Sequence, residues 1–162
     1  MEDAGELAGW GMDLEFRAAA GWSDRSLDEY RRFHCQHIAN LPAGEVMLGI
    51  TREDQLVGYV CFYLDGQASC ELGIVVGPSN NWSHGYGRRA MELAILYAKA
   101  ELNASRVWAE THPANIAAQR MLDAAGFVQS GGRGDVEQYR GHVATMIQYE
   151  ISGFGRHPRL ET

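Results

Sequence analysis

Two glycines flank a tyrosine directly before two arginines, in the segment Gly85-Tyr86-Gly87-Arg88-Arg89. The apolar residues 72–76 precede this segment, and an amphipathic segment follows it. Backbone N–H groups in the first turn of a helix have no partner within the helix and carry partial positive charge, so they bind anions. Glycine lets a phosphate approach the backbone closely, and Arg88 and Arg89 add charge although they oppose the helix dipole. The pattern predicts a binding site for a pyrophosphate group.

Two other phosphate-binding motifs differ from this one in their spacing. The phosphate loop of nucleotide hydrolases requires Gly-x4-Gly-Lys-Ser/Thr, which this segment does not contain. A dinucleotide-binding fold has a third glycine three residues after the second, where Ala90 stands, and an acidic residue after the next strand, for which Glu110 is the candidate. Alanine is allowed at that position, so dinucleotide binding stays a second hypothesis.

Hydrophobic periodicity predicts the elements that position this segment. Strands are expected over residues 46–51, 56–64, 69–76, 105–111 and 145–151, with shorter pieces at 127–130 and 137–140 around a flexible glycine loop. Helices are expected from the capping box at Ser26 to Ala39, from Gly85 to Leu102, and from the N-cap Asn115 to Gly126. Antiparallel hairpins come first and a strand-helix-strand-helix-strand unit follows, which is an α/β (α+β) pattern.

The chain ends and the second hairpin have weaker patterns. Residues 1–11 and 152–162 are expected to be loose ends, and residues 14–18 a first strand. Asp65-Gly66 predicts a two-residue hairpin turn that pairs Leu64 with Gln67 and Cys61 with Cys70. The three cysteines contain no Cys-x-x-Cys pair, so we expect reduced thiols rather than a disulfide.

Length and charge exclude several classes of protein. A chain of 162 residues has the length of one globular domain, and a formal net charge of -7 argues against binding nucleic acid or an anionic membrane. No apolar run approaches the roughly 18 residues that span a bilayer, and the acidic N-terminus does not resemble a signal peptide, so a cytoplasmic location is expected. His34, Cys35 and His37 lie on a predicted helix without a fourth ligand nearby, so no metal site is predicted.

Several segments together resemble the GNAT superfamily of acyl-CoA N-acyltransferases. They are residues 82–90, the strand at residues 70–76 before them, and Asn115 and Gly126-Phe127 after them, and the resemblance covers residues 56–127. Trp82 resembles the ribosomal-protein N-terminal acetyltransferase-like branch. The resemblance implies a single N-acetyltransferase domain over residues 1–162. Its central sheet would be mixed and mostly antiparallel, flanked by helices, with a splayed parallel pair at residues 72–76 and 107–111.

The resemblance also implies a cofactor and the residues that bind it. Acetyl-CoA would lie between the splayed strands as co-substrate, with its pantetheine arm along Ile74, Val75 and Val76. Asn115 would form a hydrogen bond with that arm, or serve as a helix N-cap, and the two roles are compatible. The pyrophosphate would lie on Ser83, His84, Gly85, Tyr86, Gly87, Arg88 and Arg89.

The same resemblance implies catalytic roles. Glu71 would accept the proton of the amine, directly or through water, and the backbone N–H of Val76 would stabilise the oxyanion. Many relatives have a tyrosine acid seven residues after the asparagine, where this chain has Leu122, and Ala118 replaces a serine of another branch. The general acid is therefore unassigned.

The expected activity is transfer of an acetyl group to a primary amine of a small molecule, an antibiotic or a peptide N-terminus. The alternative is a non-catalytic acyl-CoA-binding or sensing domain, for which Leu122 and Ala118 are the motivation. Residues 30–32 and the loop at Arg133 are expected to line the acceptor pocket. Edge strands such as residues 145–151 would allow pairing of two copies into a homodimer.

Overall fold

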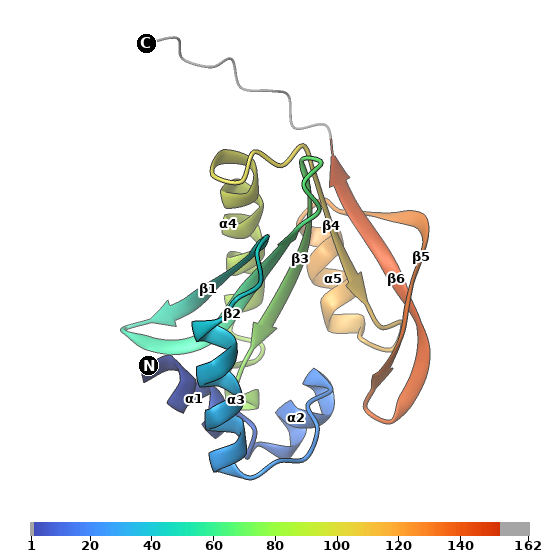
Figure 1. Cartoon of the computed structure of the whole chain (residues 1–162). Helices are drawn as coiled ribbons and strands as arrows, with labels where there is room; N and C mark the ends of the chain where they lie inside the picture. The colour runs from blue at the N-terminus through green and yellow to red at the C-terminus, as the bar shows by residue number, and fades with distance from the viewer. Residues whose placement is uncertain (1, 153–162) are drawn as a thin grey trace, which may run out of the picture.

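A six-stranded sheet forms the centre of the computed structural model, which describes residues 2–152 (Figure 1). The spatial order is β1-β2-β3-β4-β6-β5, and β3 and β4 are the parallel pair. The other neighbours pair antiparallel. The strands are β1 (Glu45–Arg52), β2 (Gln55–Leu64), β3 (Ser69–Val76), β4 (Arg106–Thr111), β5 (Val128–Tyr139) and β6 (His142–Ser152).

Helices cover the two faces of the sheet unequally. Helices α4 (Tyr86–Ala100) and α5 (Ile116–Ala124) pack on one face, where Ala90, Met91, Ala94 and Ala98 form a buried stripe on α4. The N-terminal helices lie together at the other side, near the ends of β2 and β3 (Figure 1). They are α1 (Glu2–Trp10), α2 (Leu14–Ala20) and α3 (Leu27–Ala39), and a 3-10 turn (Ser79–Asn81) follows β3.

Local capping patterns were predicted correctly. Ser26 and Glu29 form the reciprocal capping box at the start of α3. Asn115 accepts a hydrogen bond from the backbone of Ala118 at the start of α5, and Gly126 has a left-handed φ of 87° just after that helix. These contacts lie within four residues along the chain, so composition and spacing are sufficient to predict them.

The N-terminal prediction was wrong. Residues 2–10 form α1 rather than a loose lead-in, and Leu7 and Trp10 are buried. Residues 14–20 form α2 rather than a strand, with Asp13 as N-cap and Phe16 buried. Both helices bury their apolar residues against segments distant in sequence, so tertiary packing overrides the weak local pattern.

The second hairpin also differs from the prediction. Leu64 pairs with Cys70, and Cys61 pairs with Gly73, because Asp65 accepts hydrogen bonds from the backbone N–H groups of Gln67 and Ser69 and widens the turn. Since side chains alternate along a strand, Cys61 and Cys70 face opposite sides of the sheet. Both are free thiols, and burial raises the pKa of Cys70 to about 11.

The C-terminal strands form one hairpin. The two short pieces expected on either side of a glycine loop are joined in β5, whose pairing with β6 shifts register around Arg133. The expected edge strand is wrong as well, because β6 lies between β4 and β5, and the edges of the sheet are β1 and β5. The expected tail begins at Ser152, the last residue of β6, and its other residues lie outside the described part of the chain.

Candidate active site

The parallel strands β3 and β4 separate soon after they begin. They pair only over Ser69–Glu71 and Arg106–Trp108, which agrees with the predicted splayed parallel pair. Two cavities of about 1180 Å³ and about 590 Å³ lie along the separated strands. Residues from both strands and from α2, α5 and the β5–β6 hairpin line both cavities or one of them, so they form one continuous cleft. The shared lining includes Ala19, Ala20, Ile74, Val75, Asn115, Ala118, Met121, Tyr139 and Arg140.

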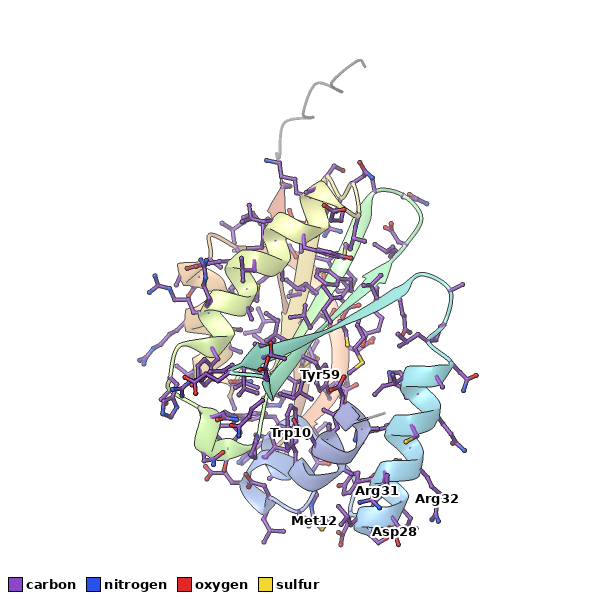
Figure 2. The ribbon with its side chains drawn as sticks, turned by 90° about the vertical axis from the view of Figure 1, so that its left-hand side faces the viewer. Trp10, Met12, Asp28, Arg31, Arg32 and Tyr59 are labelled. Carbon is purple, nitrogen blue, oxygen red and sulfur yellow. The ribbon has the colours of Figure 1, made fainter. Side chains whose placement is uncertain are left out.

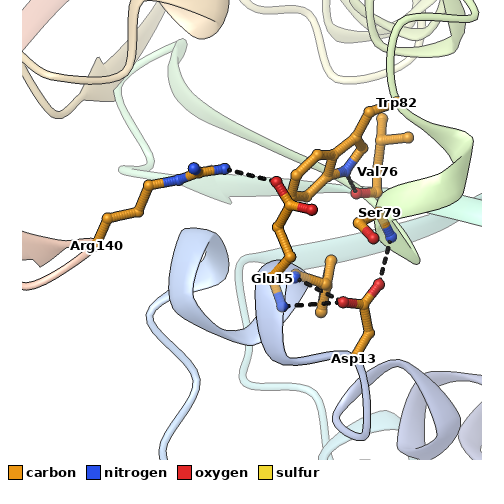
Figure 3. Close-up of polar contacts among 7 residues, drawn as sticks. Asp13, Glu15, Val76, Ser79, Trp82 and Arg140 are labelled. Atoms are coloured by element: carbon orange, nitrogen blue, oxygen red, sulfur yellow. Dashed lines mark hydrogen bonds and ion pairs between the residues drawn. The ribbon is translucent and has the colours of Figure 1, made fainter.

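Backbone groups of β3 face this cleft. The N–H of Gly77 donates to the carbonyl of Val57, which makes this a hydrogen-bonded pair of the β2–β3 ladder. Because such pairs alternate in an antiparallel ladder, the backbone groups of Ile74 and Val76 point away from β2 toward the gap beside β4. The carbonyl of Val76 accepts a hydrogen bond of 2.7 Å from the indole Nε1 of Trp82 (Figure 3). Its N–H therefore faces the cleft, as an oxyanion donor must, and that role stays a prediction.

The start of α4 borders the smaller cavity. Gly85 is the N-cap, with a φ of 83°, and its carbonyl accepts the first helical hydrogen bond from the N–H of Arg89. The N–H groups of Tyr86, Gly87 and Arg88 precede that bond, so helix geometry leaves them without a partner in the helix. A Cβ on Gly87 would lie 3.1 Å from the sulfur of Met121. A side chain at this position would therefore press on Met121 where α4 meets α5 beside this cavity.

The predicted phosphate-binding residues divide into two groups. Ser83, Gly85, Tyr86, Gly87 and Arg88 line the smaller cavity. His84 and Arg89 are exposed and are absent from that lining. The ring of His84 stacks on Tyr86, and its Nδ1 lies 2.8 Å from the carbonyl oxygen of Trp82.

Both arginines of this segment pair with one carboxylate. Arg88 and Arg89 lie 3.2 Å and 3.1 Å from the carboxylate oxygens of Glu92. Hydrogen bonds from Arg88 and Arg89 lower the pKa of Glu92. A bound phosphate would therefore compete with Glu92 for these guanidinium groups.

Three carboxylates gather beside β3 and β4. Glu71 and Glu110 share the face of the sheet away from α4, since Glu71 lies opposite Trp108 in the parallel ladder. Burial, then the negative charges of Glu110 and Asp135, raises the pKa of Glu71. A raised pKa suits a group that exchanges protons near neutral pH.

Glu110 lines the larger cavity, whereas Glu71 lies just outside its lining and Gly73, two residues further along the same face, belongs to it. Glu110 accepts hydrogen bonds from the side chain of Gln148 at 2.6 Å and from the backbone N–H of Asp135 at 3.2 Å. The sequence-based prediction missed Glu110 as a residue of the cleft. Its position two residues after Trp108 on a predicted strand was the available signal, because alternate residues share a face.

His112 is a second residue of the cleft that the sequence did not reveal. It follows β4, lines the larger cavity and is 4% exposed. Its Nδ1 accepts a hydrogen bond of 3.0 Å from the N–H of Ala114, and its ring stacks on Tyr139 with centroids 5.5 Å apart. Asn115, which was predicted, lines both cavities and caps α5. The capping role is observed, and contact with pantetheine stays a prediction.

Helix α2 is held by hydrogen bonds to the segment after β3 and by contacts with Arg140, and Figure 3 shows the contacts of Asp13 and Glu15. Asp13 accepts hydrogen bonds from Glu15 and Phe16 with one oxygen and from the N–H of Ser79 with the other. Burial opposes ionisation of Asp13, but the hydrogen bonds from these residues outweigh it and lower its pKa. The N–H of Arg140 donates to the carbonyl of Ala18 in the second half of α2, and the guanidinium of Arg140 lies 3.5 Å from Glu15 in the first turn of this helix.

Residues 30–32, which were expected to line the acceptor pocket, line neither cavity of the cleft. Arg31 and Arg32 are exposed on α3, whereas Trp10 of α1 stacks on Tyr59 of β2 nearer the sheet (Figure 2). Tyr30 is buried against Trp22 and His34. The larger cavity is bordered by α2 and the residues after it, and by the β5–β6 hairpin at residues 137–141.

Residues 1–128 match the family described as the acetyltransferase (GNAT) domain. The chain belongs to the GNAT acetyltransferase family. It is 32% identical over 80 residues to the uncharacterized N-acetyltransferase YnaD of Bacillus subtilis, a match that spans 49% of this chain and 46% of that relative. The chain thus aligns with about half the length of this curated relative.

Solved GNAT structures share the fold. A spermidine N-acetyltransferase from Vibrio cholerae in complex with CoA and spermine superposes with a TM-score of 0.74 at 19% identity, covering 93% of this chain and 89% of the other. A GNAT-family acetyltransferase from Bacillus anthracis gives a TM-score of 0.73 at 19% identity, with coverages of 93% and 89%. A putative ribosomal-protein-serine acetyltransferase from Vibrio cholerae gives 0.66 at 22% identity, with coverages of 92% and 90%. The expected family and fold class are therefore confirmed.

Neither a membrane-spanning helix nor a cluster of metal-ligating side chains occurs in residues 2–152. None of the helices within residues 2–152 is both long and apolar enough to cross a bilayer. Within the same residues, no group of three or more histidine, cysteine, aspartate or glutamate side chains is arranged to hold a metal ion.

Proposed function

We propose that the chain transfers an acetyl group from acetyl-CoA to a primary amine of a small cationic molecule. The observation that carries this proposal is the union of two unlike cavities at the separation of β3 and β4. The smaller cavity contains the positively polarised start of α4. The larger one is lined by the carboxylates Glu15, Glu110 and Glu137 and by the guanidinium groups of Arg17 and Arg140, which pair with Asp24 and Glu15, so Glu110 and Glu137 are the carboxylates left to meet a cation. One end suits a pyrophosphate and the other an ammonium group.

Acetyl-CoA fits the residues of the smaller cavity. The N–H groups of Tyr86, Gly87 and Arg88 would bind the pyrophosphate, and the absence of a side chain at Gly87 leaves the approach open. Ile74 and Val76 would bind the pantetheine arm through their backbone groups, with Asn115 on the other side of the cleft. The thioester would then lie where the two cavities meet.

The acceptor is inferred from charge. Glu110 lines the larger cavity, and the chain has a formal net charge of -7, so the field favours a cation. Structural neighbours named as spermidine N-acetyltransferases act on small amines of this kind, which supports a polyamine-like acceptor. An aminoglycoside and a peptide N-terminus remain in the panel of acceptors to be tested.

The reaction requires one proton to leave the amine and one to reach the thiolate. The uncharged amine attacks the thioester carbon, and Glu71 accepts its proton through water. The N–H of Val76 stabilises the oxyanion until the C–S bond breaks. A thiolate with an ordinary pKa of about 8.5 is a tolerable leaving group, and it takes its proton from solvent. Glu110 holds the cationic acceptor at the same time.

Release of free CoA thiol tests the proposal. Acetyl-CoA is supplied with spermidine, spermine, an aminoglycoside and an N-terminal peptide, and thiol is measured with a chromogenic disulfide. Glu71→Gln should lower kcat with little change in acetyl-CoA affinity, whereas Glu110→Gln should mainly raise the KM of the amine. Unchanged kcat in Glu71→Gln would remove this residue from the base role.

A non-catalytic acyl-CoA-binding domain is the second candidate. Leu122 and Ala118 line the cleft at the positions where relatives carry a tyrosine or a serine, and neither side chain can donate a proton. Tight binding of acetyl-CoA in calorimetry without turnover of any amine in the panel would favour this candidate.

A further inference from the structure

A row of alternating carboxylates and aromatic rings crosses the face of the sheet away from α4. Tyr63 lies beside Glu71 in the β2–β3 ladder, and Trp108 lies beside Glu71 in the β3–β4 ladder. Glu45 pairs with Tyr63 and Glu150 pairs with Trp108 at the two ends of the row. Directly paired residues share a face of the sheet, so the two rings flank the carboxylate of Glu71.

This row adjoins the larger cavity through Gly73. Gly73 lies two residues after Glu71 on the same face of β3, and it lines that cavity. A Cβ built on Gly73 would have two neighbours within 4 Å, the Cβ of Cys61 and the ring of Tyr63, each at 3.9 Å. A ligand group lying on Gly73 would therefore contact the ring of Tyr63. A chain that leaves the cavity over Gly73 reaches Glu71 next.

The two rings of the row are open to a ligand. Tyr63 is 40% exposed, and Trp108 is partly exposed. Among the described side chains of residues 2–152, no other ring and no guanidinium lies against either of them, whereas the phenol of Tyr63 is hydrogen-bonded to the thiol of Cys61. The face of an aromatic ring attracts a cation within about 6 Å of its centre.

The charge between the rings is not compensated by a neighbour. Burial, then the charges of Glu110 and Asp135, raises the pKa of Glu71, and no hydrogen bond from a described residue offsets them. Arg106, two residues before Trp108 on the same face of β4, is paired with Glu150 at 2.7 Å. A cation that enters the row would therefore meet a carboxylate and two ring faces together.

We propose that Tyr63 and Trp108 bind the ammonium group of the acceptor that does not react, which rests on the acetyl transfer proposed above. Strands about 4.8 Å apart place these side chains, on β2 and β4, roughly 9–10 Å from each other. A methylene or ammonium group between two ring faces needs about 7–8 Å, twice the usual contact distance between carbon atoms. The two rings thus select an acceptor with a second cationic group over a monoamine of equal length. Neither ring touches the reacting atoms.

Leucine and phenylalanine substitutions separate the ring faces from apolar volume. Tyr63→Leu and Trp108→Leu remove a ring and keep an apolar side chain, whereas Tyr63→Phe and Trp108→Phe keep a ring. Phe33→Leu is the matched control, because Phe33 is 45% exposed on α3 and lines neither cavity of the cleft. The probes are spermidine and n-octylamine, a monoamine of similar length. The readouts are the calorimetric Kd of each amine in the presence of CoA, and its KM and kcat in thiol release from acetyl-CoA.

Each leucine substitution should raise the Kd and KM of spermidine roughly 2- to 5-fold, and the double leucine variant should raise them further. The kcat values and the affinity for n-octylamine should change little, and the phenylalanine variants and Phe33→Leu should behave as the wild type does. Equal effects on the two amines, or wild-type spermidine affinity in the double leucine variant, would overturn the proposal. A wild-type protein that binds spermidine no better than n-octylamine would overturn it too.

Calorimetry keeps this proposal distinct from the proposed function. If the wild type binds spermidine but releases no thiol with any amine, acetyl transfer is refuted, and the Kd values of the leucine variants still decide whether the two rings bind the cation. If thiol is released and the leucine variants keep the wild-type Kd and KM for spermidine, the role of Tyr63 and Trp108 alone is refuted.

Discussion

Asp13→Asn should destabilise the protein, because the carboxylate of Asp13 makes two interactions and the substitution removes one of them. One oxygen of Asp13 caps α2 through the N–H groups of Glu15 and Phe16, at 3.0 Å and 3.1 Å. The other accepts the N–H of Ser79 at 2.8 Å (Figure 3). Asparagine caps a helix as well as aspartate does, but its NH₂ group would face the Ser79 donor. A part-buried donor left unpaired costs about 1–3 kcal/mol.

Asp13→Ala loses the cap as well, which adds about 1 kcal/mol. For a chain of 162 residues each kcal/mol lowers Tm by roughly 3 °C, so the asparagine variant should melt about 3–9 °C lower and the alanine variant lower again. The lowered pKa of Asp13 means that its contribution is present above the unfolded value of 3.8 and is lost as pH falls through the folded pKa. The deficit of Asp13→Asn should therefore shrink in acid.

Urea denaturation at several pH values measures both effects. Asp24→Asn is the matched control, because Asp24 pairs with Arg17 at 2.7 Å but its side chain is 85% exposed. That exposed pair should contribute about 0–1 kcal/mol. The expected destabilisation is refuted if the urea midpoint of Asp13→Asn equals that of the wild type, or falls by no more than the midpoint of Asp24→Asn does. The Ser79 contact would then not hold α2 in place beside the cleft.

Three further predictions concern the core, the start of α4 and the carboxylate cluster. Leu7→Ala should lower the free energy of unfolding, measured in urea, by about 2–5 kcal/mol, because Leu7 is 1% exposed. A decrease as small as that of a surface substitution would mean that α1 does not pack on the rest of the fold. Gly85 has space for a methyl group, but its φ of 83° is unfavourable for alanine, so Gly85→Ala should lower the free energy of unfolding by about 1–2 kcal/mol. Calorimetry should also show weaker binding of acetyl-CoA. Wild-type stability of this variant would contradict the strained cap. Glu71 has a raised pKa, which favours its neutral form in the fold, so its ionisation weakens folding as pH rises from the unfolded value of 4.5 through the folded pKa. Glu71→Gln should therefore gain stability over the wild type across that window and keep the gain at neutral pH, and a variant that gains nothing between acid and neutral pH would contradict the burial of this charge.

Short-range patterns made much of the fold predictable. The boundaries of α4 and β4 and the capping of α3 and α5 follow from contacts within one helical turn or from strand alternation. The α1 helix was missed because its partners lie far along the chain. Glu6 accepts a hydrogen bond from the N–H of Leu56, and Trp10 stacks on Tyr59 with centroids 6.4 Å apart. No window of sequence around α1 contains those partners.

The hairpin error has a different physical cause. Asp65-Gly66 favours a two-residue turn, but the carboxylate of Asp65 binds two backbone N–H groups of the loop and lengthens it. The register then shifts, and Cys61 faces Gly73 rather than Cys70. A rule that considers only the dipeptide Asp65-Gly66 does not take into account hydrogen bonds from the Asp65 side chain to the backbone of later residues.

The candidate site divides along the same line between local and distant contacts. The phosphate-binding end of the cleft could be predicted from the sequence, because Gly85 and Gly87 act through backbone geometry within one turn of helix. The reactive end was not, because Glu71, Glu110 and Asp135 come from three strands, and their mutual repulsion exists only once β3, β4 and β5 lie in one sheet. The burial of the His112 ring likewise depends on Tyr139, which stacks on it from another strand of the sheet. Local backbone geometry is encoded in neighbouring residues, whereas burial and charge at the cleft depend on which strands the fold brings together.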